Sequence, residues 1–171
     1  MQQLDFKTVK IFKNRGVFKE HISIDKTKPD YTIVKNVGIE FARLGKSVMA
    51  TPVLHFKSLE YAAIYAALEG TQYYRKCPDL LIDGQFYEVE TYMPPFKKGK
   101  ISHMIKKGSM QSPRIIINNS KGASDRYIRD NIYKRLKDRN FKYDINELWL
   151  YEKGKLRLLY KKTVGRLLSP R

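Results

Sequence analysis

The feature that most constrains the fold is a two-residue turn between two apolar runs. Residues 78–82 and 85–93 are rich in Leu, Ile, Val and Tyr, and Asp83-Gly84 separates them. An Asp-Gly pair between β-rich runs is a strong hairpin signal, because both positions tolerate the left-handed backbone that a tight turn requires. Strands this apolar are typical of a buried sheet. The sequence therefore predicts a β-hairpin at the centre of the fold.

This hairpin gathers acidic side chains on one of its faces. A two-residue turn places Leu80 opposite Tyr87 and therefore Asp79 opposite Glu88, with Cβ atoms about 4.5–5.5 Å apart. Glu90 lies two residues further on and shares that face. Opposed like charges destabilise a sheet, whereas Mg²⁺ favours one or two carboxylates completed by water and phosphate oxygens. The pattern predicts a divalent metal site with Asp79 and Glu88 as ligands; the alternative is a solvent-facing hairpin whose acids pair with Lys or Arg.

The rest of the chain predicts an α/β fold with a mixed central sheet flanked by helices. Strand-like and helical periodicities alternate along the whole sequence. The first fifty residues predict an N-terminal extension made of a hairpin and a helix, and 57–161 predict the core, within one domain over 1–171. The expected strands are 6–12, 17–24, 46–53, 78–82, 85–93, 114–118, 147–152 and 156–161. The expected helices are 33–44, 57–69, 99–107 and 124–137, of which 57–69 is apolar nearly all round and is expected to be buried between layers.

The charge favours a polyanionic partner. Lys and Arg number 34 against 17 Asp and Glu, for a net charge of +17, and such an excess favours nucleic acid over a neutral partner. The alternative is a merely solvated basic surface. Basic residues near the predicted site and on the later helix are the candidate phosphate contacts: Lys97, Lys98, Lys100, Arg126 and Arg129.

Membrane and secretory classes are disfavoured. No apolar run approaches the roughly 18 residues that a spanning helix needs, and the first residues lack the features of a secretory signal. The chain has one cysteine, Cys77, which excludes an internal disulfide and fits a reducing compartment. We expect a cytoplasmic protein with no membrane partner.

The hairpin also carries a family resemblance. Pro78-Asp79, followed on the next strand by Glu88-Val89-Glu90, resembles the PD-(D/E)XK nuclease superfamily. In that superfamily these acids hold a metal and a lysine assists catalysis, within a restriction-endonuclease-like core of α-β-β-α-β order. Here Glu90 stands where the lysine is usual, so the resemblance implies either an inactive relative or a lysine supplied from elsewhere.

Residues 78–118 resemble more narrowly the C-terminal tRNase toxin domains of contact-dependent growth inhibition proteins. The shared pattern is Pro-Asp, an acid on the next strand, a loop at Pro94-Pro95, a helix bearing lysine, then Gln111 and an apolar strand ending in Asn. That resemblance implies that Lys107, or its neighbour Lys106, replaces the missing lysine. It also implies an acid from the preceding helix, for which Glu60 matches best.

The resemblance implies a metal-dependent phosphodiesterase that uses Glu60, Asp79, Glu88 and Lys107, with Glu90, Lys106 and Gln111 as accessory residues. The expected metal is Mg²⁺, with Mn²⁺ or Zn²⁺ as alternatives. RNA such as tRNA is favoured over DNA as substrate, and a cognate inhibitor protein is an expected partner. Two alternatives stay open: a DNA endonuclease of the same fold, and a non-catalytic nucleic-acid-binding protein on a decayed nuclease scaffold.

Overall fold

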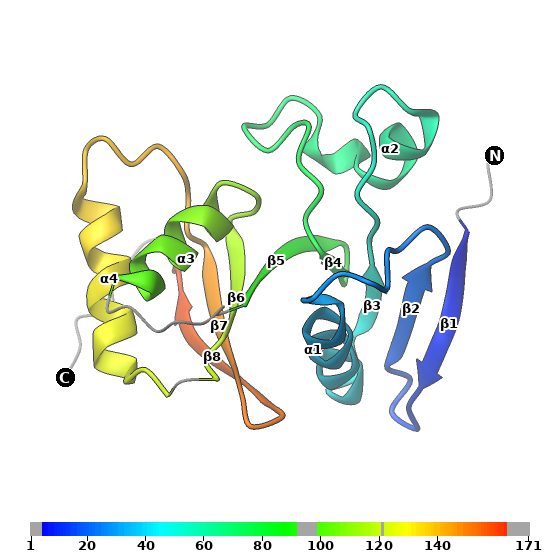
Figure 1. Ribbon diagram of the computed structural model, residues 1–171, viewed down its shortest axis with the longest axis horizontal. Helices are drawn as coiled ribbons and strands as arrows, with labels where there is room; N and C mark the ends of the chain where they lie inside the picture. The colour runs from blue at the N-terminus through cyan, green and yellow to red at the C-terminus, as the bar shows by residue number, and fades with distance from the viewer. Residues whose placement is uncertain (1–4, 92–98, 121, 164–171) are drawn as a thin grey trace.

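An eight-stranded mixed sheet flanked by helices organises the computed structural model, which describes residues 5–91, 99–120 and 122–163 (Figure 1). The strands follow one another across the sheet in chain order: β1 (Phe6–Ile11), β2 (Val17–His21), β3 (Ser47–Ala50), β4 (Leu80–Ile82), β5 (Gln85–Thr91), β6 (Arg114–Asn118), β7 (Glu147–Glu152) and β8 (Lys155–Lys161). The helices are α1 (Tyr31–Arg43), α2 (Leu59–Ile64), a 3-10 turn (Ala66–Leu68), α3 (Lys100–Ser109) and α4 (Asp125–Lys137). The predicted α/β class is therefore confirmed. Within the described ranges, no helix has the length and apolar character to cross a membrane.

The central hairpin has the predicted register. Strands β4 and β5 are antiparallel and pair Leu80 with Tyr87 and Ile82 with Gln85. Asp83 and Gly84 adopt φ angles of 46° and 77°, the left-handed conformation that a tight two-residue turn requires. Strand β5 then pairs in parallel with β6, and the sheet is mixed because β2–β3 and β6–β7 are also parallel.

The first fifty residues are more than an extension of the core. They supply β1, β2 and β3 to the same sheet, and β3 pairs directly with β4 of the hairpin. Helix α1 packs Val37 and Phe41 into the apolar cluster that contains Leu80 and Val89. The hairpin thus receives one of its two covering layers from a segment that the family resemblance did not include.

The expectation of a long buried helix over 57–69 is wrong. Helix α2 ends at Ile64 and is followed by the 3-10 turn, while Ala62 and Ala63 are exposed and Leu59 retains 76% of its surface. Only one side of this segment packs, where Tyr61 and Tyr65 join an aromatic cluster. Small Ala side chains make a helix look apolar all round without requiring that it be buried.

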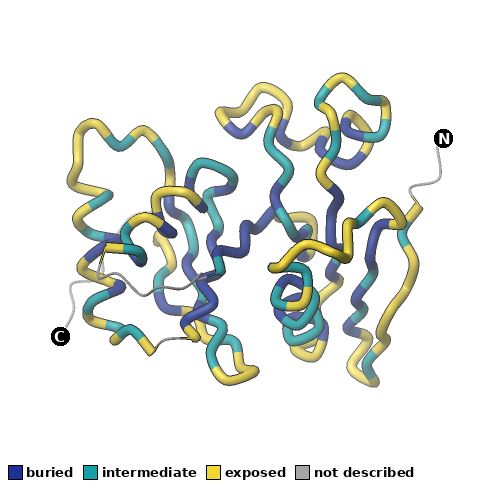
Figure 2. Tube along the Cα trace, in the orientation of Figure 1, coloured by how far each residue is buried: buried dark blue, intermediate teal, exposed yellow. Residues whose placement is uncertain are grey.

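Two apolar clusters cover opposite faces of the sheet and leave β5 and β6 largely buried (Figure 2). Tyr87 and Val89 belong to the α1 cluster. Ile115 and Ile117, which pair with Glu88 and Glu90, belong to the cluster under α3 and α4. Because side chains alternate along a strand, Glu88 and Glu90 face the α3 side.

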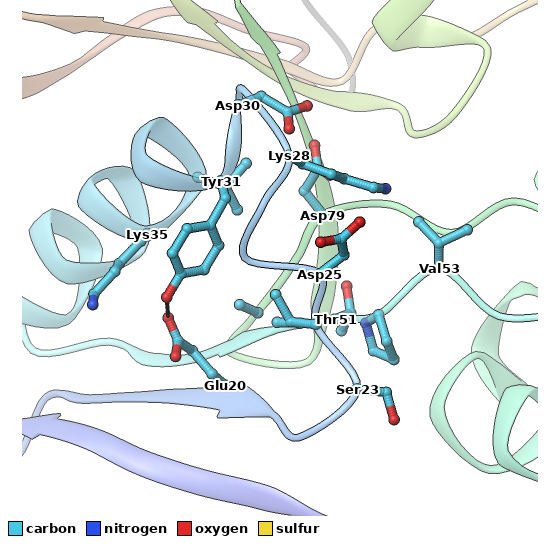
Figure 3. Close-up of a pocket in the computed structure, with 14 residues that line it drawn as sticks. Glu20, Ser23, Asp25, Lys28, Asp30, Tyr31, Lys35, Thr51, Val53 and Asp79 are labelled. Carbon is cyan, nitrogen blue, oxygen red and sulfur yellow. Dashed lines mark hydrogen bonds between the residues drawn. The ribbon is translucent and has the colours of Figure 1, made fainter.

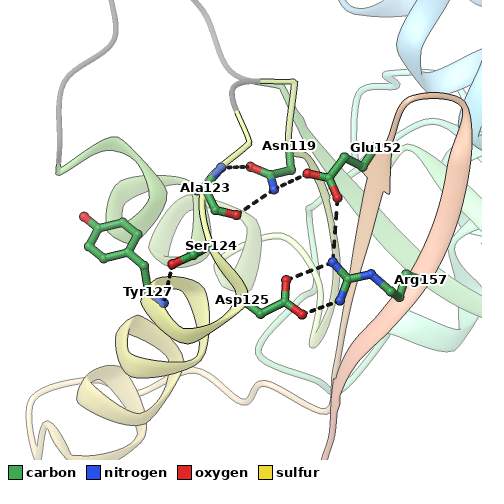
Figure 4. Close-up of polar contacts among 7 residues, drawn as sticks. All are labelled: Asn119, Ala123, Ser124, Asp125, Tyr127, Glu152 and Arg157. Carbon is green, nitrogen blue, oxygen red and sulfur yellow. Dashed lines mark hydrogen bonds and ion pairs between the residues drawn. The ribbon is translucent and has the colours of Figure 1, made fainter.

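A polar network ties the start of α4 to the β7–β8 hairpin (Figure 4). The Asn119 side chain is 3% exposed; it accepts the Ala123 N–H at 2.9 Å and donates to the Ala123 carbonyl at 2.9 Å and to Glu152 Oε1 at 2.8 Å. Arg157 makes two hydrogen bonds to Asp125 in the first turn of α4. The network holds α4 in place and leaves Arg126 and Arg129 exposed on it.

We expect Asn119→Ala to destabilise the protein by about 2–4 kcal/mol, because it removes three hydrogen bonds and leaves the groups that made them with Asn119 without a partner inside the fold. Urea unfolding followed by circular dichroism measures the change. Asn140→Ala, on an exposed position after α4, is the matched control. A change below about 0.5 kcal/mol in Asn119→Ala, the range of an ordinary surface substitution, would show that the network does not anchor the helix.

Candidate functional site

Strand β5 changes its pairing partner at Glu88. Its first half, 85–87, pairs with β4, and its second half, from Glu88 to Thr91, pairs with β6. Asp79 immediately precedes β4, beyond the last residue pair between β4 and β5. Its Oδ2 accepts the Val89 N–H at 2.9 Å. The side chain of Asp79 thereby takes the place of a backbone partner and is fixed beside Glu88, as the hairpin register predicts.

Asp79, Glu88 and Glu90 form what we call the carboxylate cluster. Glu88 is only 9% exposed and Glu90 only 3% exposed. Within the described part of the chain, Glu88 Oε2 and Glu90 Oε1 are buried and have no hydrogen-bond partner. Buried, unpaired carboxylate oxygens are costly, so the cluster is incomplete without a cation or a proton.

The pKa values of the three carboxyl groups reflect the cost of burying their charges. Burial raises the pKa of Asp79, partly opposed by the Val89 N–H, and the charges of Asp30 and Glu90 raise it further. Burial raises the pKa of Glu88 well above its usual range, and the charges of Asp79 and Glu90 add to the effect. Burial also raises the pKa of Glu90, while Lys107 opposes the change. Raised pKa values at adjacent carboxyls are characteristic of sites that bind or move charge.

Lys107, in the last turn of α3, reaches this cluster. Its Nζ lies 3.1 Å from Glu90 Oε2. Partial burial lowers the pKa of Lys107, but the charges of Glu90, Glu88 and Asp79 outweigh it, and the net shift is upward. Gly108 permits the approach of α3, since a Cβ there would lie 2.9 Å from Ile115 Cγ2 and 3.2 Å from Glu90 Cγ.

Asp79, Glu88, Glu90 and Lys107 are therefore together in the structure. Glu60 is placed elsewhere: its Oε1 lies 3.2 Å from Nε2 of the buried His21. Lys106 is exposed on α3, and Gln111 is half-buried in the turn that follows.

The predicted phosphate contacts that the structure describes lie on two helices. Arg126 and Arg129 are exposed on α4, and Lys100 begins α3. Lys97 and Lys98 fall outside the described residues. The predicted basic surface is thus described here only for the two helices.

Sequence reasoning missed Asp30. It immediately precedes α1, and its charge contributes to the raised pKa of both Asp79 and Glu90. The Pro29-Asp30 pair marks a helix start in the sequence, but nothing in the local pattern links residue 30 to residue 79. That proximity arises from the packing of α1 on the hairpin.

The residues present fit a hard divalent cation. Their donors are carboxylate oxygens, which Mg²⁺ and Mn²⁺ prefer, and two of these oxygens are buried without partners. In the described ranges, no group of three or more His, Cys, Asp or Glu side chains is arranged to hold a metal ion by itself. A metal bound by Asp79 and Glu88 would need water or substrate oxygens among its ligands, as Mg²⁺ commonly has.

Comparison with known proteins supports the fold. No family model matches the chain, and neither does any curated protein. Among solved structures, a chain of a CdiA-CT/CdiI toxin and immunity complex from Burkholderia pseudomallei is similar, with 17% sequence identity and a TM-score of 0.52. The match covers 91% of this chain and 96% of that one. At this identity the similarity establishes a shared fold over nearly the whole of both chains.

Proposed function

We propose that this protein is a metal-dependent phosphodiesterase that cleaves RNA such as tRNA. The observation that carries the proposal is the convergence of the carboxylate cluster with Lys107 at the point where β5 changes partners. Glu90 occupies the position where the Glu-x-Lys pattern of the nuclease superfamily has its lysine, and Lys107 from α3 pairs with that Glu90. The substrate class rests on the resemblance in sequence and on the net charge of +17.

Asp79 and Glu88 would hold the metal ion, which when bound supplies charge neutralisation at the phosphate and activation of water. The Val89 N–H donates to Asp79 Oδ2 and so fixes the orientation of the carboxylate, including its other oxygen, Oδ1. Glu90 holds Lys107 by an ion pair. The Lys107 ammonium would stabilise the negative charge that develops on phosphate oxygens as a water oxygen bonds to phosphorus and the ester P–O bond breaks.

The neighbour in the structure comparison suggests a biological setting. That chain belongs to a complex of a toxin with its immunity protein, and by analogy we propose that this protein is a toxin-related RNase that a cognate inhibitor protein holds inactive. The exposed Arg126 and Arg129 on α4 would contact phosphates of the substrate without reading its sequence.

The direct test is incubation of the full chain with tRNA and with duplex DNA, in Mg²⁺ or Mn²⁺ and in chelator. We expect cleavage of tRNA that requires the metal and weakens as salt is added. Metal-dependent cleavage of DNA alone would reassign the substrate. Tight, salt-sensitive binding without cleavage of either polymer would favour the non-catalytic alternative.

Lys107→Met should lower the rate of RNA cleavage about 100-fold, because one preorganised donor to the developing charge is lost. Lys107→Arg, which keeps the charge, should retain more activity than Lys107→Met. Single-turnover gel assays measure both. Lys106→Met tests the neighbouring lysine: a large loss there, with Lys107→Met near wild type, would transfer the role to Lys106.

A further inference from the structure

A cavity of about 290 Å³ adjoins the carboxylate cluster, and Asp79 lies in its wall. The other walls come from the segment before α1, from α1 itself and from the chain that follows β3 (Figure 3). Its volume lies just below the roughly 300–1,000 Å³ typical of small-molecule sites, which suits a small ligand group. We call it the Asp79 pocket, and neither the family resemblance nor the proposed mechanism uses it.

The lining of the pocket combines three chemistries. Ile24, Val34, Pro52 and Val53 provide apolar surface. Tyr31 adds an aromatic side chain, whose hydroxyl is engaged by Glu20 at 2.8 Å. Asp25 and Asp30 add carboxylates, and Lys28 adds a cation beside them (Figure 3).

Two of these carboxylates have acceptor oxygens to spare. Among the described residues, Asp25 accepts hydrogen bonds from the Thr27 N–H and hydroxyl, and both end on Oδ1. Asp30 precedes α1 but makes no side-chain capping bond to it. Glu20, by contrast, is already engaged by Tyr31 and by Lys26 at 3.1 Å. The pocket therefore offers Asp25 and Asp30 to a ligand that carries hydrogen-bond donors.

The mixture of charges discriminates between ligand classes. A cationic side chain of a partner protein would match Asp25 and Asp30 but would meet Lys28 and Lys35, which line the same pocket. A nucleotide matches all the groups: amino groups of the base donate to carboxylates, the flat ring packs on apolar and aromatic surface, and the phosphate attracts lysine. Uracil matches less well, since it offers carbonyls where the other bases carry an exocyclic amine.

We propose that the Asp79 pocket is a subsite for one unpaired nucleobase bearing an exocyclic amine (adenine, cytosine or guanine) next to the phosphate that is cleaved. This inference rests on the proposed RNase function, because Asp79 is common to the pocket and to the carboxylate cluster. It makes the substrate single-stranded at the point of attack, since a base that is paired and stacked in a duplex must leave the helix before it can enter a cavity.

The test uses fluorescence anisotropy of labelled ten-nucleotide RNAs of A, C or U, bound to the full chain in chelator so that no cleavage occurs. We expect the A and C polymers to bind about tenfold more tightly than the U polymer. Val53→Trp fills the pocket from a position that is 69% exposed and should abolish this preference. Ile22→Trp is the matched control, since Ile22 is 51% exposed on the adjacent loop and does not line the pocket.

Each outcome decides the proposal. Equal affinity of wild type for the three RNAs, or a preference that survives Val53→Trp, would overturn it. If Val53→Trp leaves RNA binding unchanged but abolishes binding of an arginine-rich peptide, the pocket takes a cationic protein side chain and the proposal is also overturned.

Glu88→Ala separates base binding in the pocket from catalysis. Glu88 does not line the pocket, so this variant should keep the base preference while losing cleavage. A wild-type protein that prefers A and C but cleaves nothing would sustain base binding in the pocket and refute both the RNase function and the position beside a cleaved phosphate.

Discussion

Asp79→Asn should reduce metal-dependent RNA cleavage at least about 1,000-fold, because it removes one of the two charged ligands proposed for the metal. The amide keeps the shape of the side chain and can still accept the Val89 N–H. The substitution also relieves repulsion, since the charge of Asp79 contributes to the raised pKa of Glu88. The variant should therefore fold with a thermal midpoint equal to or above that of wild type, so that lost activity cannot be attributed to unfolding.

Asp83→Asn is the matched control for this experiment. Asp83 lies four residues away in the hairpin turn, where it is exposed and pairs with Lys46 at 2.8 Å. Exposed ion pairs contribute at most about 1 kcal/mol, and the turn is remote from the proposed chemistry. Cleavage by Asp83→Asn should stay within about threefold of wild type. Wild-type rates in Asp79→Asn, insensitive to chelator, would refute the role of the cluster.

The two carboxylates and the hairpin could be predicted because their geometry is local. An Asp-Gly turn sets the register of the strands beside it, and that register alone brings Asp79 to Glu88. Lys107 was reached through family resemblance, and its contact with Glu90 depends on the close packing that Gly108 allows. No periodicity in the sequence encodes that approach.

The sequence was least informative about the helix that covers the hairpin. The apolar stretch around Tyr61 and Tyr65 looked like a core helix, but its aromatic side chains pack on one side and its alanines remain exposed. Helix α1 takes that position instead, and it brings Asp30 to the site and closes the Asp79 pocket. These are long-range consequences of strand order, which pairs β3 with β4 across almost thirty intervening residues.

Glu88→Gln should have the second large effect: it should raise the stability of the protein and lower its rate of RNA cleavage. Glu88 is buried, one of its oxygens has no partner among the described residues, and its pKa in the folded protein is raised well above the usual value. A folded carboxyl with a raised pKa binds more protons than the unfolded chain does. Wild-type stability from this group is therefore present at low pH and is lost as pH rises from about 4.3 through the folded pKa.

The neutral amide has no such dependence, so the thermal midpoint of Glu88→Gln should exceed that of wild type at pH 8 by about 2–8 °C, with a smaller difference at pH 5. Cleavage should fall about 100-fold or more in the same variant, because a charged oxygen ligand is gone. Differential scanning calorimetry over this pH range, beside single-turnover cleavage, measures both effects.

Added Mg²⁺ should stabilise the wild-type protein through the same two carboxylates. A cation held by Asp79 and Glu88 offsets the cost of their ionisation, so it should raise the wild-type thermal midpoint at pH 8 and do so less at pH 5, where protons compete for the same oxygens. In Glu88→Gln the rise should be largely lost. An equal rise in both proteins would place the metal elsewhere. A Glu88→Gln variant that is less stable than wild type at pH 8 in chelator would show that the buried carboxylate stabilises the fold. A carboxylate kept to bind a cation should instead destabilise the fold when that cation is absent.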